Sequence, residues 1–260
     1  MLLLIDAGNT RVKWALVDEG APTGVWRASG ALLHAELDTL TTVLQQHQPQ
    51  RAWLSNVAGA ALRTRLESLL IAGGVAQQAQ RWFRSSAQQA GVISSYRDPS
   101  QLGSDRFASM MGARALFPGQ ALIVVTAGTA TTIDAIDATG RFLGGMILPG
   151  LATMAQSLAL NTAQLPQVEA RLLDTCFADN TPDAIASGCI QAQIGAILRA
   201  RQQLPAAGCV LSGGAAKYLL PLVPPPVDQV EHLVLHGLQV RSEEHTSELQ
   251  SRQYLVCRLL

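Results

Sequence analysis

A carboxylate directly after a buried strand is the first chemically suggestive feature of this sequence. Leu2 to Ile5 is an unbroken apolar run, which is typical of a strand buried on both faces. The run ends at Asp6, and the small, polar stretch Ala7-Gly8-Asn9-Thr10 follows. Glycine allows close approach of a ligand, and a carboxylate beside amides and hydroxyls suits Mg²⁺ and phosphate oxygens. By spacing alone, Asp6 and Asn9 can equally supply ordinary turn chemistry.

The same pattern returns about 120 residues later. Ala121 to Val125 is a second apolar run, and it leads into a stretch with Gly128, Thr129, Thr131 and Thr132. A third apolar run, Gly208 to Ser212, ends in Gly213-Gly214. None of these turns matches a Walker phosphate loop or a Gly-x-Gly-x-x-Gly fingerprint. Together they predict two like domains and a cleft whose donors bind a nucleotide, and the alternative is ordinary strand-to-strand turns.

A second candidate site is Gly103-Ser104-Asp105-Arg106, at the start of a predicted helix over 104–116. The carboxylate of Asp105 can accept the proton of a substrate hydroxyl, and the guanidinium of Arg106 can hold a carboxylate with two hydrogen bonds. Tyr96, upstream, can stack or hydrogen-bond at the same place. The alternatives are a helix cap with an incidental ion pair and a half-buried loop aromatic.

Composition excludes several functional classes. The 260 residues are 48% apolar and carry no net charge, which argues against nucleic acid as a partner. The four cysteines form no Cys-x-x-Cys pair and indicate small core residues in a reducing cytosol. No apolar window reaches membrane-spanning length, and Leu2–Ile5 is too short for a signal peptide.

Hydrophobic periodicity and Gly/Pro punctuation divide the chain into alternating elements. Thr181-Pro182-Asp183 is read as a helix start with Thr181 as the hydroxyl cap. Loops are expected over 85–103 and 161–180. The predicted strands cover 2–5, 12–16, 25–31, 51–57, 79–84, 121–125, 133–136, 141–147, 208–212 and 230–236, and the predicted helices cover 36–47, 60–72, 104–116, 151–160, 181–204 and 215–222.

The last twenty residues, Arg241–Leu260, differ in composition from everything before them. The segment RSEEHTSELQS resembles the in-frame translation of a sequencing-library adapter. We therefore predict that the native sequence is cut near Val240 and that 241–260 is a non-native tail. The alternative is a genuine, charged C-terminal helix.

The combined motifs resemble the type III pantothenate kinases. They occur in family order, cover residues 1 to about 240, and are most specific in the segment from Tyr96 to Arg106. The matching residues are Asp6-x-Gly8-Asn9-Thr10 with Lys13; Tyr96, Pro99 and Leu102 before Gly103-Ser104-Asp105-Arg106; Gly128-Thr129-Ala130-Thr131-Thr132; Gly144-Gly145 with Pro149-Gly150; Thr181, Ala184-Ile185 and Gly188; and Gly213-Gly214.

The resemblance implies an α/β, actin-like fold (acetate and sugar kinase/Hsp70/actin) of two ribonuclease-H-like domains with a central ATP cleft. The expected domains are 1–117 and a truncated 118–240. The resemblance further implies ATP-dependent phosphorylation of pantothenate, the first step towards coenzyme A, by a cytoplasmic homodimer whose partner subunit helps complete the pantothenate site.

The resemblance also assigns roles by position. Asp105 is the expected general base. The expected pantothenate-binding residues are Tyr96, Gly103, Ser104, Arg106 and Thr181. The expected nucleotide-binding residues are Asp6, Ala7, Gly8, Asn9, Thr10, Arg11, Val12, Lys13 and Thr129 around the phosphates and Gly213 and Gly214 near the nucleoside, with Asp6 as the Mg²⁺ ligand.

One departure from the family pattern affects the expected cofactors. Many members carry Asp, associated with K⁺ or NH₄⁺, where this chain has Thr126. A neutral hydroxyl is a poorer ligand for a hard cation, so a monovalent-cation site of the usual kind is not expected. Two rival functions stay open: a nucleotide-binding accessory regulator of the same fold, and a kinase for another small hydroxyl acceptor.

Overall fold

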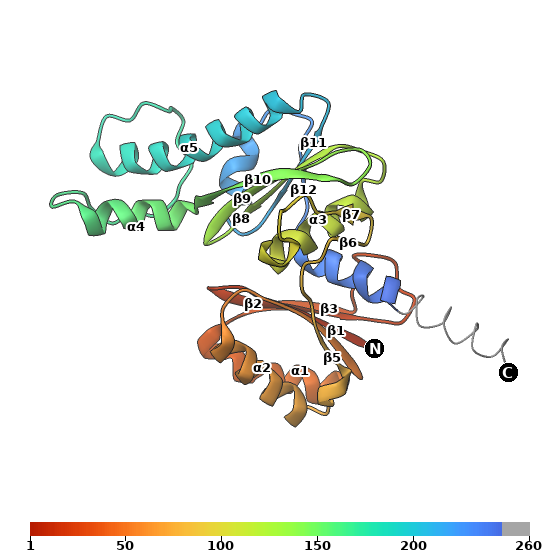
Figure 1. Cartoon of the computed structure of the whole chain (residues 1–260). Coiled ribbons are helices and arrows are strands. Elements are labelled where there is room, and N and C mark those ends of the chain that lie inside the picture. The colour runs from red at the N-terminus through yellow and green to blue at the C-terminus, as the bar shows by residue number, and fades with distance from the viewer. Residues whose placement is uncertain (246–260) are drawn as a thin grey trace, which may run out of the picture. The chain divides into compact units, whose positions relative to one another are not determined.

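The computed structural model describes residues 1–245, and they form two compact units. The first unit contains Met1–Phe117 together with the described residues from Leu233 onward. The second unit contains Pro118–His232. Each unit has its own sheet, drawn in red-brown for the first and in green to blue for the second (Figure 1).

The sheet of the first unit has the strand order β3-β2-β1-β4-β5. A meander of antiparallel pairs is followed by two parallel neighbours, with β4 beside β1 and β5 beside β4. The strands are β1 (Leu2–Ala7), β2 (Arg11–Val17), β3 (Ala28–Leu33), β4 (Arg51–Asn56) and β5 (Gln80–Trp82).

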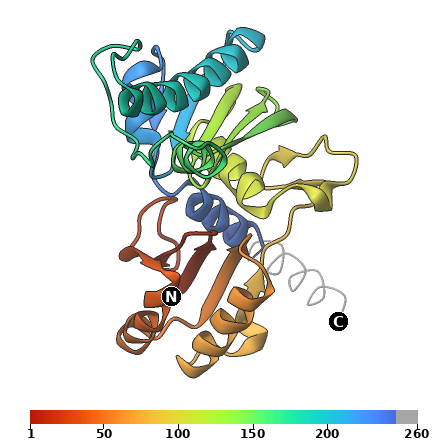
Figure 2. The same ribbon diagram turned by 90° about the vertical axis from the view of Figure 1, so that its left-hand side faces the viewer.

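The two faces of this sheet carry different helices, as Figures 1 and 2 show. Leu3, Ile5 and Ala7 of β1 pack in one core with leucines of α1 (Leu40–His47) and α2 (Ala60–Ala72). Because side chains alternate along a strand, Asp6 points to the other face, where α3 (Ser104–Leu116) packs on β4. The remaining elements are η1 (His34–Thr39), η2 (Gln77–Ala79), the short hairpin β6 (Gln88–Gln89) and β7 (Val92–Ile93), and η3 (Pro99–Gln101).

The second unit repeats the sheet of the first. Its strand order is β10-β9-β8-β11-β12, with the same sequence of antiparallel and parallel neighbours. The strands are β8 (Leu122–Ala127), β9 (Ala130–Ile136), β10 (Phe142–Pro149), β11 (Gly208–Ser212) and β12 (Asp228–Gln229). The internal repeat read from the two apolar runs is therefore a repeat of topology.

The helices of the second unit pack on one face of its sheet. Isoleucines of α5 (Thr181–Gln203) share a core with Ile123 and Val125 of β8. Helix α4 (Leu151–Asn161) lies beside α5 in Figure 1 and contributes Leu151 and Ala155. The unit is completed by α6 (Ala216–Leu219) and η4 (Leu220–Leu222).

The predicted strand over 230–236 is wrong. Residues 233–245 are helical, and Leu233, Val234 and Leu238 are buried. A short apolar run fits a strand or a buried helix equally, and the four-residue spacing of the buried Val234 and Leu238 fits the helix. The residues from Leu233 belong to the first compact unit, where Gly237 lies against the backbone of Ala108, so the second unit ends before the expected boundary at 240.

The origin of the segment 241–260 stays a prediction. Its first five residues, 241–245, continue the C-terminal helix, and the rest lies outside the described residues. Among the residues that the structure does describe, no helix combines the length and the hydropathy that a membrane crossing requires.

Candidate active site

Asp6 lies at the carboxyl end of β1, and the sheet register selects its neighbours. Across the antiparallel pair it faces Lys13 of β2, and across the parallel pair it faces Ser55 of β4. The ammonium Nζ of Lys13 is 3.8 Å from Oδ2 of Asp6, and Asp6 is 7% exposed. The first unit therefore carries a buried carboxylate with a cation beside it.

The turn that follows Asp6 is tied at both ends. The N–H of Gly8 donates to the carbonyl of Arg11 at 3.1 Å, and Nε2 of His34 lies 2.9 Å from the carbonyl oxygen of Gly8. Asn9, Thr10 and Arg11 are exposed, so the turn presents polar groups outward. Sequence reasoning missed His34, because nothing in its local sequence indicates a contact 26 residues away.

Two residues of the predicted phosphate segment have side chains unsuited to a ligand. Ala7 and Val12 are fully buried in the core that faces α1 and α2. Any part that these two residues take in binding is restricted to their backbone groups.

The helix start that carries Asp105 is held by a short set of contacts. Gly103 is the N-cap, and the N–H of Arg106 donates to Oδ1 of Asp105 at 2.8 Å. A Cβ on residue 103 would lie 2.7 Å from Oδ1 of Asp105, so glycine leaves room for this carboxylate. The hydroxyl of Ser104 is 2.8 Å from the hydroxyl of Ser55. Ser55, like His34, was overlooked by sequence reasoning, and its only signal was its place at the end of a buried strand.

Asp6 and Asp105 share one electrostatic environment. The pKa of Asp6 is raised to about 6, chiefly by burial and in smaller part by the charge of Asp105, while Lys13 acts in the lowering direction. Burial also raises the pKa of Asp105, while the backbone N–H and the guanidinium of Arg106 lower it. The geometry agrees, because Ser55, the register partner of Asp6, bonds Ser104, the residue before Asp105. The segments that carry the two carboxylates are therefore neighbours in the first unit.

Arg106 is a buried cation whose position is set by Tyr96. It is 6% exposed, and its Nη1 donates to the phenolic oxygen of Tyr96 at 2.9 Å. The guanidinium carbon lies 5.8 Å from the centroid of the Tyr96 ring. Tyr96 and Arg106, predicted to act together on the acceptor, are thus neighbours beside Asp105.

Thr129, Gly213 and Gly214 lie in the second unit, at the corresponding edge of its sheet. The carbonyl of Thr129 accepts from the N–H of Gly150 and from the hydroxyl of Thr153, each at 2.9 Å. Gly213 has φ +96° and packs against the backbone of Ala127, which requires glycine. The turn Gly128-Thr129 follows β8 and the turn Gly213-Gly214 follows β11. The two turns are adjacent because β8 and β11 are parallel neighbours.

Thr181 lines a pocket of about 730 Å³ between α4, the segment 162–180 and α5, with Met154, Ile185 and Gly188 in the same wall. The helix cap is Asn180, not Thr181 as predicted: the Asn180 side chain accepts from the N–H of Asp183 at 3.0 Å. The side chain of Asn180 satisfies this backbone N–H, so Thr181 is the first residue of the helix and not its cap.

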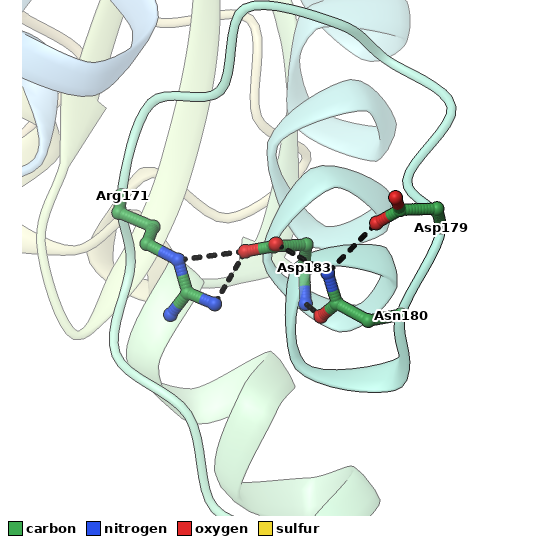
Figure 3. A network of polar contacts seen from close by, with 4 residues as sticks. All are labelled: Arg171, Asp179, Asn180 and Asp183. Carbon is green, nitrogen blue, oxygen red and sulfur yellow. Dashed lines mark hydrogen bonds and ion pairs between the residues drawn. The ribbon is translucent and has the colours of Figure 1, made fainter.

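Figure 3 shows the polar network that fixes this helix start. Arg171 donates from Nε and Nη2 to Oδ1 of Asp183 at 2.9 and 2.5 Å, and Asn180 donates to Oδ2 at 2.6 Å. Hydrogen bonds from Asn180 and Arg171 lower the pKa of Asp183. The network holds Thr181 at the wall of the pocket.

The predicted site residues therefore fall into two groups. Asp6 to Lys13, Tyr96 and Gly103 to Arg106 lie in the first unit, and Thr129, Thr181 and the pair Gly213-Gly214 lie in the second. That both groups bind one nucleotide and one acceptor in a common cleft stays a prediction.

Two sheets of identical strand order, each with a glycine turn after its central strand, are the arrangement of the actin-like fold. Solved structures support this fold: a candidate Baf family transcriptional activator from Campylobacter jejuni has a TM-score of 0.60 at 22% identity, covering 94% of this chain and 99% of that one. A candidate 2-dehydro-3-deoxygalactonokinase from Sinorhizobium meliloti has a TM-score of 0.58 at 13% identity, with coverage of 94% and 99%.

The chain belongs to the type III pantothenate kinase family, whose model matches residues 2–203. A type III pantothenate kinase of Janthinobacterium sp. (strain Marseille) is 49% identical over 258 residues, which covers 95% of this chain and 99% of the relative. The resemblance read from the sequence motifs is confirmed.

Proposed function

We propose that the chain transfers the γ-phosphoryl group of ATP to the primary hydroxyl of pantothenate, giving 4′-phosphopantothenate and ADP. This is the first step of coenzyme A biosynthesis. The observation that carries the proposal is the shared, desolvated site of Asp6 and Asp105, with the Tyr96–Arg106 pair beside it. Family membership supplies the identity of the substrates.

Asp105 acts as the general base. Its carboxylate takes the proton of the acceptor hydroxyl as that oxygen bonds to the γ-phosphorus, and the bond from phosphorus to the bridging oxygen of ADP breaks. A pKa raised by burial brings this carboxylate closer to neutral pH, where a base is most effective. Arg106, buried and oriented by Tyr96, holds the carboxylate of pantothenate.

The residues around Asp6 fit a magnesium ion that enters with ATP. Within the described residues, no three His, Cys, Asp or Glu side chains gather into a metal site. The family resemblance assigns Asp6 as the carboxylate that would bind the cation. Mg²⁺ commonly binds with one or two carboxylates, substrate phosphates and water. When bound, Mg²⁺ neutralises charge on the phosphates, and Lys13, beside Asp6, adds positive charge at the same place.

We do not expect a monovalent cation to activate this chain, because it lacks the aspartate that is associated with K⁺ or NH₄⁺ in many family members. Thr126 occupies the position in β8 that corresponds to Asp6 in β1, and its register partners are Thr132 and Ser212. All three side chains are neutral hydroxyls, which are weaker ligands for a hard cation than a carboxylate.

We further propose that the chain works as a cytoplasmic homodimer. Large apolar side chains stand exposed on β10, the edge strand of the second sheet, and on α4 with the segment after it. A monomer rarely exposes apolar residues in such numbers on one unit. The residues are Leu143, Met146 and Ile147 on β10, Leu158 and Leu160 on α4, and Leu172 and Phe177 beyond it.

The direct test is ADP release in a coupled assay, with and without pantothenate. Pantothenate-dependent release supports the kinase, and phosphopantothenate is then identified by mass spectrometry. Nucleotide binding without turnover would instead support an accessory regulator, and turnover only with other hydroxyl acceptors would support a kinase of different specificity. No observation on the described residues favours either rival function. A regulator, moreover, has no need for the Asp105–Arg106 pair.

A further inference from the structure

Ser55 stands at the junction between the two predicted halves of the first unit's site. It is the register partner of Asp6 in the parallel pair of β1 and β4, so both side chains point to the same face of the sheet. Its hydroxyl lies 2.8 Å from that of Ser104, the residue before Asp105. One buried side chain therefore touches the helix start that carries the base while sitting beside the phosphate-site carboxylate.

The burial of Ser55 makes this contact more than a surface hydrogen bond. Ser55 is 0% exposed, so its hydroxyl has no bulk water as an alternative partner. Gly103, the N-cap of α3, has no side chain that could accept from the first backbone N–H groups of the helix. The Ser55–Ser104 bond is thus a side-chain link between β4 and the first turn of α3, and it spans 49 residues of sequence.

We propose that Ser55 is a positioning residue for catalysis: its hydroxyl, through Ser104, holds the first turn of α3 so that the Asp105 carboxylate is oriented toward the acceptor hydroxyl. The inference rests on the proposed kinase function. Ser55 touches neither substrate, so it acts on the rate of phosphoryl transfer and leaves nucleotide affinity alone. Small displacements of a catalytic group cost rate steeply, because general-base catalysis requires hydrogen-bond geometry.

The test compares Ser55→Ala, Ser104→Ala and the double variant in single-turnover reactions with saturating Mg²⁺-ATP and pantothenate. Loss of one hydrogen bond is expected to slow phosphoryl transfer roughly 3- to 10-fold, with the KM for ATP changed less than about twofold. The double variant should be no slower than either single one, because both changes break the same bond. Ser68→Ala, on the outer face of α2 with a hydroxyl bonded to the Thr64 carbonyl, is the matched control and should retain the wild-type rate.

A background of Asp105→Asn separates positioning from general loss of structure. If Ser55 acts through the Asp105 carboxylate, Ser55→Ala should slow that background by less than about 1.5-fold. A full 3- to 10-fold loss in the Asp105→Asn background would show that Ser55 acts elsewhere and would overturn the inference. Should Ser55→Ala fail to fold, Ser55→Cys keeps a side chain of similar shape with a much weaker hydrogen-bond donor and is compared in the same two backgrounds.

The outcomes also distinguish this inference from the proposed function. Wild-type turnover together with a Ser55→Ala rate equal to that of Ser68→Ala overturns the positioning role and leaves the kinase intact. Absence of any pantothenate-dependent turnover by the wild-type chain overturns both. A rise in the KM for ATP at an unchanged transfer rate would place Ser55 on the nucleotide instead and also contradicts the proposal.

Discussion

Replacing Asp6 with asparagine should make the ligand-free protein more stable at neutral pH, while removing the carboxylate expected to bind Mg²⁺. The pKa of Asp6 is raised from 3.8 to about 6, chiefly by burial, so folding favours its protonated form. Because the folded state binds the Asp6 proton more tightly than the unfolded state, Asp6 makes its full contribution to the free energy of unfolding below pH 3.8. This contribution is lost as the pH rises through about 6. Above pH 7, the buried, ionised carboxylate costs the folded state roughly 3 kcal/mol, and at pH 5 about half of that.

Asparagine has nearly the shape of a protonated aspartate and does not titrate. We therefore expect the difference in unfolding free energy between Asp6→Asn and wild type to grow by about 1.5 kcal/mol from pH 5 to pH 7.5. Urea unfolding followed by tryptophan fluorescence measures it, since all four tryptophans lie in the first unit with Asp6. EDTA and the absence of nucleotide keep cations from Asp6.

Asp38→Asn is the matched control for this experiment. Asp38 lies in the same unit, with a side chain 75% exposed and an ion pair to Arg65 at 2.8 Å. Because so exposed a pair adds little to stability, its variant should differ from wild type by less than about 1 kcal/mol. A difference for Asp6→Asn that is flat with pH, or a variant less stable than wild type at pH 7.5, would refute the argument that burial sets the pKa of Asp6. Adding Mg²⁺ and ATP should stabilise wild type alone, because a cation favours the ionised carboxylate.

Four further outcomes follow from the site. Asp105→Asn should keep ATP binding, measured by calorimetry, and lower kcat roughly 10²- to 10⁴-fold, and wild-type turnover would remove Asp105 from the role of base. Tyr96→Phe loses the acceptor for Arg106 and should raise the KM for pantothenate about 3- to 10-fold with a smaller change in kcat. Ile147→Glu places a charge on the exposed edge strand and should convert a dimer into monomers in sedimentation experiments, and a wild-type monomer would end the dimer proposal. Turnover should vary less than about twofold when K⁺ replaces Na⁺, whereas a strong K⁺ requirement would show that Thr126 suffices for a cation site.

Local sequence predicts elements well where punctuation is strong. Helices α2 and α3 have the predicted bounds, because Gly73-Gly74 ends the first and Gly103 precedes the second. The strands predicted over 2–5 and 12–16, on either side of the turn after Asp6, are β1 and β2, and they pair antiparallel. Signals within about four residues, such as caps, turns and period, were sufficient for these elements.

Contacts between distant segments could not be predicted in this way. The partnership of Asp6 with Ser55 depends on the register of two parallel strands, and the Ser55–Ser104 bond depends on where α3 packs. The run ending at His236 was ambiguous between strand and helix until packing against the first unit was known. Family resemblance named Asp105, but only the structure shows that its charge raises the pKa of Asp6.

The repeat gives the two sheets equivalent end positions, and the residues at these positions differ in chemistry. In the first sheet, the equivalent end positions of three neighbouring strands are Asp6, Lys13 and Ser55.

In the second sheet the same three positions are Thr126, Thr132 and Ser212. One backbone plan thus presents charged groups in one unit and hydroxyls in the other. The charged side chains of the first unit suit a metal ion and the charge that develops on a transferred phosphoryl group. The hydroxyl donors of the second unit suit phosphate oxygens whose charge another group already neutralises. The sheet topology positions both sets, and the identity of three residues per unit decides what each set can bind.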